Sequence, residues 1–573
     1  MCGIVGIISD NLNAKEIIGC LSRLEYRGYD STGLALVSDN KIIVKKNVGY
    51  VECLKLDNEL SGNVGIGHVR WATHGGVTEL NAHPHIDCKN EYAIVHNGII
   101  ENYAELKNDL IKAGHIFKSD TDSEVIAHLI EKYSSSGFKS AFEKAISMLK
   151  GSYAIVALSR KDNYLMVARK DSPLMICEAR NKVYVVSDIV AIEDIEKIHE
   201  VIEGIASVVS LDIKDNEISI PKVEFGGNGK CGYPHYMLKE INEQPITFQE
   251  ALKQDKDKLI GVAFDILRAR DVVLTACGTS RFASIVGRYL MSRLANKFSE
   301  VIVGSEAHYF SNSFNDSTLL LAVSQSGETA DVLSGVNLAK KRGSKIVSIV
   351  NKPYSSLERI SDVTLFLNCG AEISVASTKA FTNELAIFYL LAYTMANKYD
   401  SGLIELMGIP EKINQCLAQN DKVKEVAEII KNAEHIYYIG KGINFAVSGE
   451  CSLKLKEVSY IHAESMSAGE LKHGTLALVD KGTPIIGLCP DDYTYQETIA
   501  NMHEAKVRNA LIIGISDKYN EVFDYWLPIP KVKDIYYPLV STIIGQLLAY
   551  YVAVFRGLNV DRPRNLAKSV TVI

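Results

Sequence analysis

The sequence predicts a layered α+β domain of the αββα type in its N-terminal part and doubly wound parallel α/β sheets in its C-terminal half. Short β-rich segments outnumber helical ones in residues 1–222. From residue 247 to residue 556, apolar strands alternate with amphipathic helices, which is typical of a parallel sheet covered by helices on both faces. A glycine-rich connector at 223–246 separates the two patterns.

The bulk composition fits an ordinary globular protein and excludes some classes of partner. A chain of 573 residues is too long for one hydrophobic core, and its hydrophobic content is 47%. The net charge of −7 provides no basic surface for nucleic acid or for an anionic membrane. The apolar stretch Tyr536–Val554 is long enough to span a membrane, but Pro538 and Gln546 inside it favour a buried helix.

The cysteines indicate a reducing compartment. There are eleven, an odd number, and they form no C-x-x-C pair and no Cys/His cluster at zinc spacing. We therefore expect a cytoplasmic protein with no structural zinc or other metal site.

The elements of the N-terminal domain are predicted from short apolar runs and the turns between them. A β-type run begins directly after Cys2, and two helices are expected, at Asn102–Ala113 and Ser123–Lys132. Further strands are expected at Gly33–Val37, Lys41–Val44, Tyr92–Val95, Tyr153–Ala157, Tyr164–Ala168 and Val183–Val186.

The C-terminal half contains a degenerate repeat. Asp271–Ser280 and His435–Asn444 each form an apolar strand that enters a glycine turn, and matching Gly278 to Gly442 aligns the two. A helix-like segment follows each copy. We therefore predict two similar α/β units, at 247–412 and 413–556, followed by a tail at 557–573 that is too apolar to be fully solvated.

Cys2 is the first candidate for chemistry. Removal of Met1 would leave a cysteine with both a thiol and a free α-amine. The amine is a base in the same residue, so an N-terminal cysteine can be activated by its own amine. The alternative is a buried structural thiol, the usual role of a lone cysteine.

Three further polar segments lie at the ends of predicted strands or before a predicted helix. They could complete a site around Cys2. They are His68–Gly75, His96–Gly98 and Ser119–Asp122. Spacing alone favours a helix N-cap for Asp122 and Ser123. For the histidines of these segments and for His83, the simpler interpretation is a structural role with hydrogen-bonded rings.

Taken together, these segments resemble the N-terminal-nucleophile glutamine amidotransferases. The motifs that carry the resemblance are Met1-Cys-Gly-Ile-Val-Gly6, Glu25-Tyr-Arg-Gly-Tyr-Asp-Ser31, Arg70-Trp-Ala-Thr-His-Gly75, Asn81-Ala-His-Pro-His85 and His96-Asn-Gly98. The resemblance covers essentially the whole first domain. It implies that Cys2 attacks the side-chain amide of glutamine, with Asn97 and the N–H of Gly98 as the oxyanion hole. It also implies a glutamine pocket formed by Arg70, Trp71, Thr73, His74 and Asp122, with Trp71 as a gate.

A second polar cluster follows an apolar strand in the C-terminal half. Leu319–Thr329 ends in hydroxyl-bearing residues around Gly327, and Ser374–Lys379 adds more hydroxyls. Hydroxyls and free N–H groups at a helix start can bind a phosphate, although a capped helix is the alternative. No lysine follows Gly327, which excludes a Walker-type nucleotide loop. A small phosphorylated molecule is therefore the expected ligand.

Charged residues share one predicted helix face. Glu450, Lys454 and Glu457 are spaced i, i+4 and i+7. Surface ion pairs of about 0.3–0.5 kcal/mol each are the common interpretation of such a face. The unusual segment Ser467–Gly474, which contains His473, favours acid–base chemistry on a sugar instead, because aldose–ketose isomerisation needs a base and a ring-opening group.

The C-terminal motifs resemble the sugar isomerase (SIS) fold, and a glutaminase followed by two SIS units is the order of the glucosamine-6-phosphate synthase family. The resemblance implies the substrates glutamine and fructose 6-phosphate, an ammonia channel, no metal or organic cofactor, and the first step of amino-sugar (UDP-GlcNAc) biosynthesis. It implies Glu457 as the isomerising base with Lys454 beside it, and Lys568 as the Schiff-base lysine on a tail that closes the sugar site. Because the family supplies the ring-opening His473 from the other subunit, a homodimer is implied. The implied sugar-phosphate ligands are Thr279, Ser280, Ser324, Gln325, Ser326, Thr329, Val375, Ser377 and Glu450.

Two alternatives remain at this point. One is the same chemistry on another ketose phosphate. The other is a non-catalytic sensor of sugar phosphates built from SIS units, which would need no base at Glu457.

Overall fold

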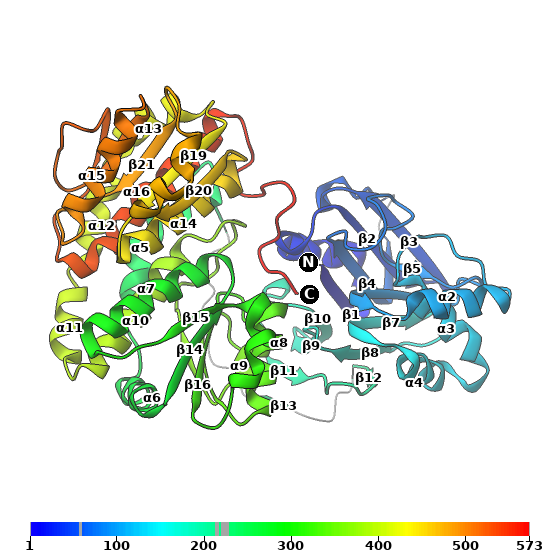
Figure 1. Cartoon of the computed structure of the whole chain (residues 1–573). Coiled ribbons are helices and arrows are strands. Elements are labelled where there is room, and N and C mark those ends of the chain that lie inside the picture. Colours follow the sequence, from blue (N-terminus) through cyan, green and yellow to red (C-terminus); the bar gives the residue numbers. More distant parts are fainter. Residues whose placement is uncertain (1, 57–59, 212–216, 219–228, 572–573) are drawn as a thin grey trace. The chain divides into compact units, whose positions relative to one another are not determined.

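The computed structural model describes residues 2–56, 60–211, 217–218 and 229–571. The chain forms two compact units, one made of Met1–Glu224 with Ser569–Val572 and the other of Phe225–Lys568 (Figure 1). Each unit has its own sheets and its own hydrophobic core.

The first unit contains two antiparallel sheets. The larger has the order β13 (Glu217–Ile218), β11 (Lys197–Glu200), β9 (Met175–Ala179), β10 (Lys182–Val186), β1 (Gly3–Asn13), β4 (Ser61–Arg70), β2 (Ser31–Ser38), β3 (Lys41–Val48). The smaller has the order β12 (Ser207–Val209), β8 (Leu165–Lys170), β7 (Gly151–Ser159), β6 (Tyr92–Ile100), β5 (His85–Ile86).

The two sheets pack face to face, and helices cover their outer faces. One buried cluster combines Ile4 and Ile66 of the larger sheet with Val95 and Val156 of the smaller. The outer face of the smaller sheet packs against α3 (Glu124–Tyr133) and α4 (Phe138–Met148), with α2 (Tyr103–Lys112) beside them. Helix α1 (Ala14–Leu24) covers the larger sheet, because Ile17 lies against Gly65 and Gly67 of β4. The predicted αββα layering is confirmed.

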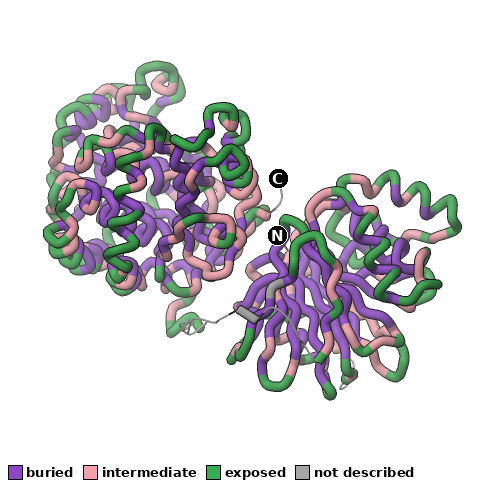
Figure 2. The backbone as a smooth tube through the Cα atoms, turned by 90° about the horizontal axis from the view of Figure 1, so that it is seen from below, coloured by how far each residue is buried: buried purple, intermediate pink, exposed green. Residues whose placement is uncertain are grey.

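Strand β1 is buried on both faces, which explains the uninterrupted apolar run after Cys2. Figure 2 shows the buried strands of this unit as a continuous core. All six other predicted strands are present, within a few residues of their expected ends. Helices α1 and α4 were not expected. Helix α1 follows β1 without a loop, because Asn13 ends the strand and caps the helix by accepting from the Lys15 N–H at 2.9 Å.

The second unit contains two parallel sheets with equivalent strand orders. The first is β15 (Glu300–Val303), β14 (Asp271–Ala276), β16 (Thr318–Ser324), β17 (Lys345–Val350), β18 (Val363–Phe366). The second is β20 (His462–Ser467), β19 (His435–Gly440), β21 (Pro484–Leu488), β22 (Leu511–Ser516), β23 (Tyr525–Pro528). Gly278 and Gly442 follow the matching strands β14 and β19, and both have a positive φ, of +54° and +57°. The predicted repeat is therefore confirmed, down to the conformation of the glycine in each turn.

The helices of the second unit cover these sheets and join them in one core (Figure 1). They are α5 (Tyr236–Ala251), α6 (Lys256–Arg268), α7 (Gly278–Ala295), α8 (Ala330–Lys341), α9 (Ser356–Ile360), α10 (Lys379–Met395), α11 (Tyr399–Leu406), α12 (Ile409–Leu417), α13 (Asn420–Ile430), α14 (Ile443–Ser459), α15 (Tyr495–Lys506) and α16 (Tyr537–Phe555). Met237 and Ile241 of α5 are fully buried in this core, so the second part of the predicted connector is a core helix.

Helix α16 corresponds to the long apolar stretch of the sequence. By length and composition alone it could cross a membrane, but 89% of its most apolar window is buried inside the protein. Ser541, Thr542 and Gln546 are among the buried residues, and the Gln546 Nε2 donates to the Thr378 carbonyl at 3.2 Å. The predicted buried helix is confirmed.

Close packing of α7 against α10 gives a stability test. A Cβ added at Gly287 would lie 2.4 Å from the Phe388 ring, whereas one at Gly261 on the exposed side of α6 would meet nothing within 4 Å. We expect Gly287→Ala to destabilise the second unit by about 1–3 kcal/mol through overpacking. Gly261→Ala should be neutral or stabilising by up to about 1 kcal/mol. Denaturant unfolding monitored by circular dichroism distinguishes them, and equal midpoints would contradict the packing described.

Candidate active sites

Cys2 lies at the start of β1, where β1 pairs with β4. Its thiol donates to the Trp71 carbonyl at 3.4 Å, and its Sγ accepts from the Trp71 N–H at 3.2 Å. Gly28 packs against the backbone of the same segment, where an added Cβ would lie 2.6 Å from the carbonyl carbon of Arg70 and 2.7 Å from the Trp71 nitrogen. Burial raises the pKa of the Cys2 thiol, although the Arg70 charge opposes this. The resting group is therefore a thiol that needs a base before it can attack.

Asn97 on β6 is oriented towards Cys2 by a buried histidine. The Asn97 Nδ2 donates to the Cys2 carbonyl at 3.0 Å. The His68 Nε2 lies 3.0 Å from the Asn97 Oδ1 and 3.1 Å from the His96 carbonyl. Both of these atoms are acceptors, so the Nε2 carries the proton. Burial lowers the pKa of His68 to about 3, which keeps the ring neutral and fixes the amide with its N–H groups towards Cys2.

Gly98 directly follows Asn97 in a conformation that requires glycine. Its φ is +123°, and an added Cβ would lie 2.2 Å from the Ser152 carbonyl oxygen. The structure therefore brings together three of the predicted residues: Cys2, Asn97 and Gly98.

The predicted glutamine-pocket residues frame the loop after β4. The Arg70 guanidinium donates to the carbonyls of His74 at 2.6 Å, Gly75 at 3.0 Å and Gly76 at 3.1 Å, so it holds this loop. The Asp122 Oδ2 accepts from the Ile100 N–H at 2.7 Å, and Ser123 makes no capping hydrogen bond with its side chain. Ser123 therefore occupies the N-cap position of α3 as expected, but neither side chain of the pair caps the helix. Aromatic neighbours pack edge-on against the loop, with Tyr29 on Trp71 and Tyr103 on His74, while Thr73 is exposed.

In the second unit, the predicted phosphate-binding hydroxyls meet in one turn between β16 and α8. The Ser324 Oγ accepts from the Gly327 N–H at 3.1 Å and lies 2.9 Å from the Thr329 Oγ1. The Ser326 Oγ accepts from the Glu328 N–H at 3.2 Å, and the Gln325 carbonyl accepts from the Asn351 N–H at 3.0 Å. Thr329 makes no capping hydrogen bond at the start of α8, which leaves that helix end suited to an anion.

Thr279 and Ser280 begin α7 and contact buried carboxylates. The Thr279 hydroxyl donates to Glu450 at 3.3 Å, and the Ser280 hydroxyl donates to Glu384 at 2.6 Å. Burial raises the pKa of Glu450 to about 8, against the opposing charge of Lys454. Burial also raises the pKa of Glu384 well above its usual range.

Glu450, Lys454 and Glu457 share a face of α14, as predicted, but this face is buried. The Lys454 Nζ donates to the Glu457 Oε2 at 2.5 Å and lies 3.6 Å from the Glu450 Oε1. The side chains of Lys454 and Glu450 are 1% and 0% exposed, whereas that of Glu457 is 19% exposed. Surface ion pairs are therefore the wrong interpretation, and Glu457 is the most accessible of the three to a ligand.

Lys568 on the C-terminal tail contacts the loop before α10. Its Nζ donates to the Glu372 Oε2 at 2.5 Å and to the Ser377 Oγ at 3.2 Å. The Val375 N–H donates to the Asp561 carbonyl at 3.0 Å, which attaches the tail to the same loop. Burial would raise the pKa of Glu372, but the Lys568 charge and hydrogen bonds lower it to about 2. His473, at the end of a 3₁₀ turn (Ala468–His473), is exposed, and in the described residues no hydrogen bond joins it to Glu457 or Lys568.

Sequence reasoning missed the groups that hold these residues in place. His68 is a structural histidine with a hydrogen-bonded ring, as expected, but its role in orienting Asn97 is not visible in the sequence. Glu372 and Glu384 are not singled out by the sequence analysis. Glu372 lies two residues before the Ser374–Lys379 hydroxyl cluster, so an acidic residue next to that cluster was the available signal. Glu384 lies in the apolar run of α10, where a lone carboxylate is itself unusual.

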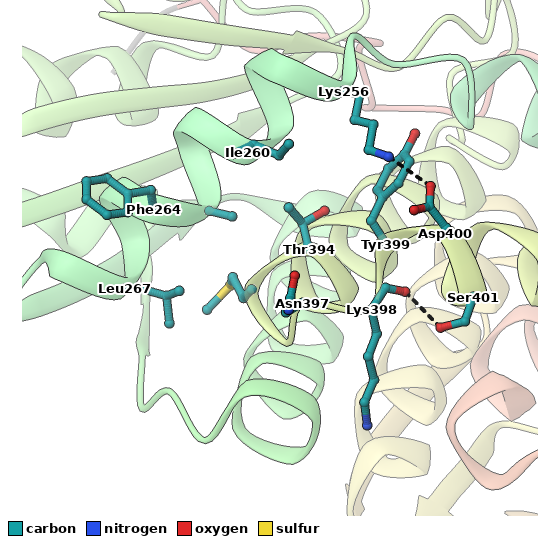
Figure 3. Close-up of a pocket in the computed structure, with 12 residues that line it drawn as sticks. Lys256, Ile260, Phe264, Leu267, Thr394, Asn397, Lys398, Tyr399, Asp400 and Ser401 are labelled. Atoms are coloured by element: carbon teal, nitrogen blue, oxygen red, sulfur yellow. Dashed lines mark hydrogen bonds and ion pairs between the residues drawn. The ribbon is translucent and has the colours of Figure 1, made fainter.

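A surface groove of about 510 Å³ lies elsewhere, between α6 and the start of α11 (Figure 3). Its polar side is closed by the Lys256–Asp400 ion pair at 2.8 Å, and Ile260 and Phe264 form part of its apolar lining. None of the predicted site residues lines it, so it is not the predicted sugar site.

Comparison with known proteins defines the class of each unit. A glutamine amidotransferase domain model matches residues 68–194, and a SIS domain model matches 265–394 and 429–556. The chain is similar to the C-terminal domain of a glucosamine-fructose-6-phosphate aminotransferase from Francisella tularensis, with 34% identity and a TM-score of 0.55, over 58% of this chain and all of that one.

The full-length relatives narrow this class to one family. Proteins named glutamine–fructose-6-phosphate aminotransferase [isomerizing] from Pyrococcus horikoshii and Thermotoga maritima are 41% and 39% identical to the chain, in each case over 100% of both chains. The chain belongs to the family of isomerising glutamine–fructose-6-phosphate aminotransferases.

The Glu372–Lys568 pair predicts a pH dependence of stability. The pKa of Glu372 is about 2 in the folded chain, against an ordinary value of 4.5. A depressed carboxylate pKa stabilises the fold above about pH 4.5, and this contribution is lost as the pH falls towards about 2. We expect Glu372→Gln to lower the melting temperature most at about pH 6, by less at about pH 3.5, and by little as the pH approaches about 2.

The control for this comparison is Glu425→Gln, since Glu425 is exposed on α13. It should leave the melting temperature unchanged at both pH values. A deficit of Glu372→Gln that stays constant from about pH 6 to pH 3.5 would rule out the ionised, Lys568-paired carboxylate.

Proposed function

We propose that this protein converts fructose 6-phosphate and glutamine into glucosamine 6-phosphate and glutamate. One observation carries the proposal. A single chain, similar over its full length to aminotransferases of this name, holds Cys2 beside an oriented amide donor in one unit and a buried Glu/Lys cluster in the other. A glutaminase supplies ammonia, and the SIS half supplies the acceptor.

The first reaction uses the N-terminal site. With Met1 removed, the α-amine of Cys2 takes the thiol proton, and the Sγ attacks the amide carbon of glutamine. The Asn97 Nδ2 and the Gly98 N–H stabilise the oxyanion of the tetrahedral intermediate. Its collapse transfers the proton to the leaving ammonia and leaves a thioester on Cys2. Water then hydrolyses the thioester to glutamate and regenerates the thiol.

The residues around Cys2 would bind the rest of the glutamine molecule. Arg70 suits the α-carboxylate through its planar donor groups, and Asp122 suits the α-ammonium. Binding would require Arg70 to share or exchange its contacts with the loop carbonyls. That loop contains Trp71, Thr73 and His74. Because Arg70 holds the loop and would also bind the substrate, substrate binding would change the order of the loop.

The second reaction uses the sugar site. The hydroxyls of Ser324, Ser326 and Thr329, with Gln325, would bind the phosphate, and Thr279, Ser280, Val375, Ser377 and Glu450 would surround the sugar. After ring opening by His473, the deprotonated Lys568 amine condenses with the C2 ketone and releases water. Ammonia then displaces Lys568 to give a C2 imine. Glu457 moves a proton from C1 to C2, and the O1 hydroxyl proton passes to the imine nitrogen, which yields the 2-amino aldose.

The environment of Glu457 fits the role of base. It is an accessible carboxylate hydrogen-bonded to the buried Lys454, which holds it in one position. His473 is exposed on its own chain, which fits a role in the site of a second copy, and we propose a homodimer on this basis. A cytoplasmic location follows from the same proposal, because both substrates are ordinary soluble metabolites.

Asn97→Ala tests the glutaminase assignment. Loss of one oxyanion donor should lower kcat for glutamate release by about 10²–10³-fold, with a much smaller change in KM. Steady-state assays of glutamate release measure both constants. Asn11→Ala, at an exposed position of β1, is the matched control and should behave as the parent enzyme. An unchanged kcat in Asn97→Ala would remove Asn97 from the mechanism.

Glu457→Gln tests the base on the sugar side. The variant should lose amino-sugar formation by at least about 10²-fold, because general-base catalysis contributes on that scale. It should still bind fructose 6-phosphate, as measured by calorimetry, since the phosphate contacts lie on another element. Glu425→Gln serves again as the exposed control. Retained product formation in Glu457→Gln would assign the base to another group.

A further inference from the structure

Four potential metal ligands gather in the first unit, and neither proposed half-reaction uses them. Cys88 follows β5, His115 follows α2, and His128 and Glu131 lie one turn apart on α3. Their ligand atoms all lie within 4.8 Å of one another. Thiolate, imidazole and carboxylate groups are the three kinds of protein ligand that zinc accepts.

The distances between these atoms match the edges of a tetrahedral site. Zinc bonds of about 2.0–2.3 Å place tetrahedral ligand atoms roughly 3.3–3.8 Å apart. The Cys88 Sγ lies 3.6 Å from the His128 Nδ1 and 3.9 Å from the His115 Nδ1. The Glu131 Oε2 lies 3.5 Å from the His128 Nδ1 and 2.9 Å from the His115 Nδ1. Three of these four edges fit within about 0.1 Å, and the short one is a direct hydrogen bond.

Charged groups and a backbone N–H lie next to the outer atoms of the cluster. The His128 Nε2 is buried and makes no hydrogen bond, and the Glu124 Oε1 lies 3.5 Å from it, so a small shift would give the outer-shell carboxylate contact that is common in metal sites. With the proton on Nε2, the lone pair of the His128 Nδ1 faces a sulfur and a carboxylate oxygen, an arrangement that a cation stabilises. The other carboxylate oxygen of Glu131 lies 3.6 Å from the ammonium group of Lys89. The Cys88 Sγ accepts from the Ile116 N–H at 3.3 Å.

We propose that Cys88, His115, His128 and Glu131 bind one Zn²⁺ ion. One thiolate and one carboxylate neutralise the two positive charges, and the two imidazoles bind as neutral ligands. Four protein ligands close the coordination sphere, so the ion is structural and activates no water. This proposal departs from the expectation of no metal site. The ligands come from three separate segments, so their spacing resembles no zinc motif.

The ion would link the loop after β5 and the loop after α2 to helix α3. The same helix start orders the segment that carries Asp122. Glu124 accepts from the N–H groups of Lys118 at 2.9 Å and Ser119 at 2.7 Å. Zinc binding should therefore raise the melting temperature of the first unit.

Metal analysis and cobalt substitution of the full-length chain test the proposal. Chelator-treated protein should take up a single zinc ion per chain, and Co²⁺ in its place should give the intense visible bands of a tetrahedral site with a thiolate-to-cobalt charge-transfer band. Cys88→Ser should lose the charge-transfer band and the zinc-dependent rise in melting temperature. Glu124→Gln should weaken zinc binding by about 10–100-fold. Cys53→Ser, at another exposed cysteine of this unit, should bind as the parent does.

Two results would overturn the proposal. One is a parent chain that takes up no zinc at micromolar concentrations. The other is Cys88→Ser with the same stoichiometry, affinity and cobalt spectrum as the parent. Because Cys88 is exposed in a loop, its replacement by serine should leave the folded core intact. The cobalt spectrum of the parent chain is a test that does not depend on any variant, because it either shows the bands of a tetrahedral site or does not.

Discussion

The need to pair buried carboxyl groups with hydroxyl or ammonium groups constrains the second unit more than any other interaction. Glu450, Glu384 and Glu372 are all fully buried, and each faces a hydroxyl or an ammonium group. A carboxylate without such a partner would cost several kcal/mol in this environment. The requirement fixes Lys454 within α14 and attaches the tail through Lys568. It thereby connects α7, α10, α14 and the C-terminal tail at one place, where the proposed sugar chemistry needs both a base and an amine.

The first unit reaches its chemistry by a different route, through neutral groups and backbone geometry. His68 is held uncharged by burial and orients Asn97, while Gly28 and Gly98 allow backbone segments to approach within distances that any side chain would prevent. The first part of strand β1, from Gly3 to Ser9, is buried between β10 and β4, so the sheet itself positions Cys2.

Much of this arrangement was predictable from the sequence because it depends on local patterns. The strand that enters the turn at Gly278 and its copy at Gly442 are visible as apolar runs ending in glycine. Cys2, Asn97 and the Glu450–Lys454–Glu457 face follow from short motifs or helical spacing. The partners that hold them, His68, Glu372 and Glu384, could not be assigned, because their roles depend on contacts between distant segments. The cluster of Cys88, His115 and His128 could not be predicted for the same reason. Helix α1 could not be predicted because it follows β1 directly, with no loop residues to mark its start.

The central claim is that two reactions on one chain are coupled by ammonia. The most direct measurement is the amount of glutamate and of amino-sugar phosphate formed by Met1-processed protein with glutamine alone, fructose 6-phosphate alone, and both together. The account predicts equal amounts of glutamate and glucosamine 6-phosphate with both substrates, and no amino sugar with either one alone. Glutamate formed with both substrates but without any amino sugar would contradict it and would point to a different acceptor.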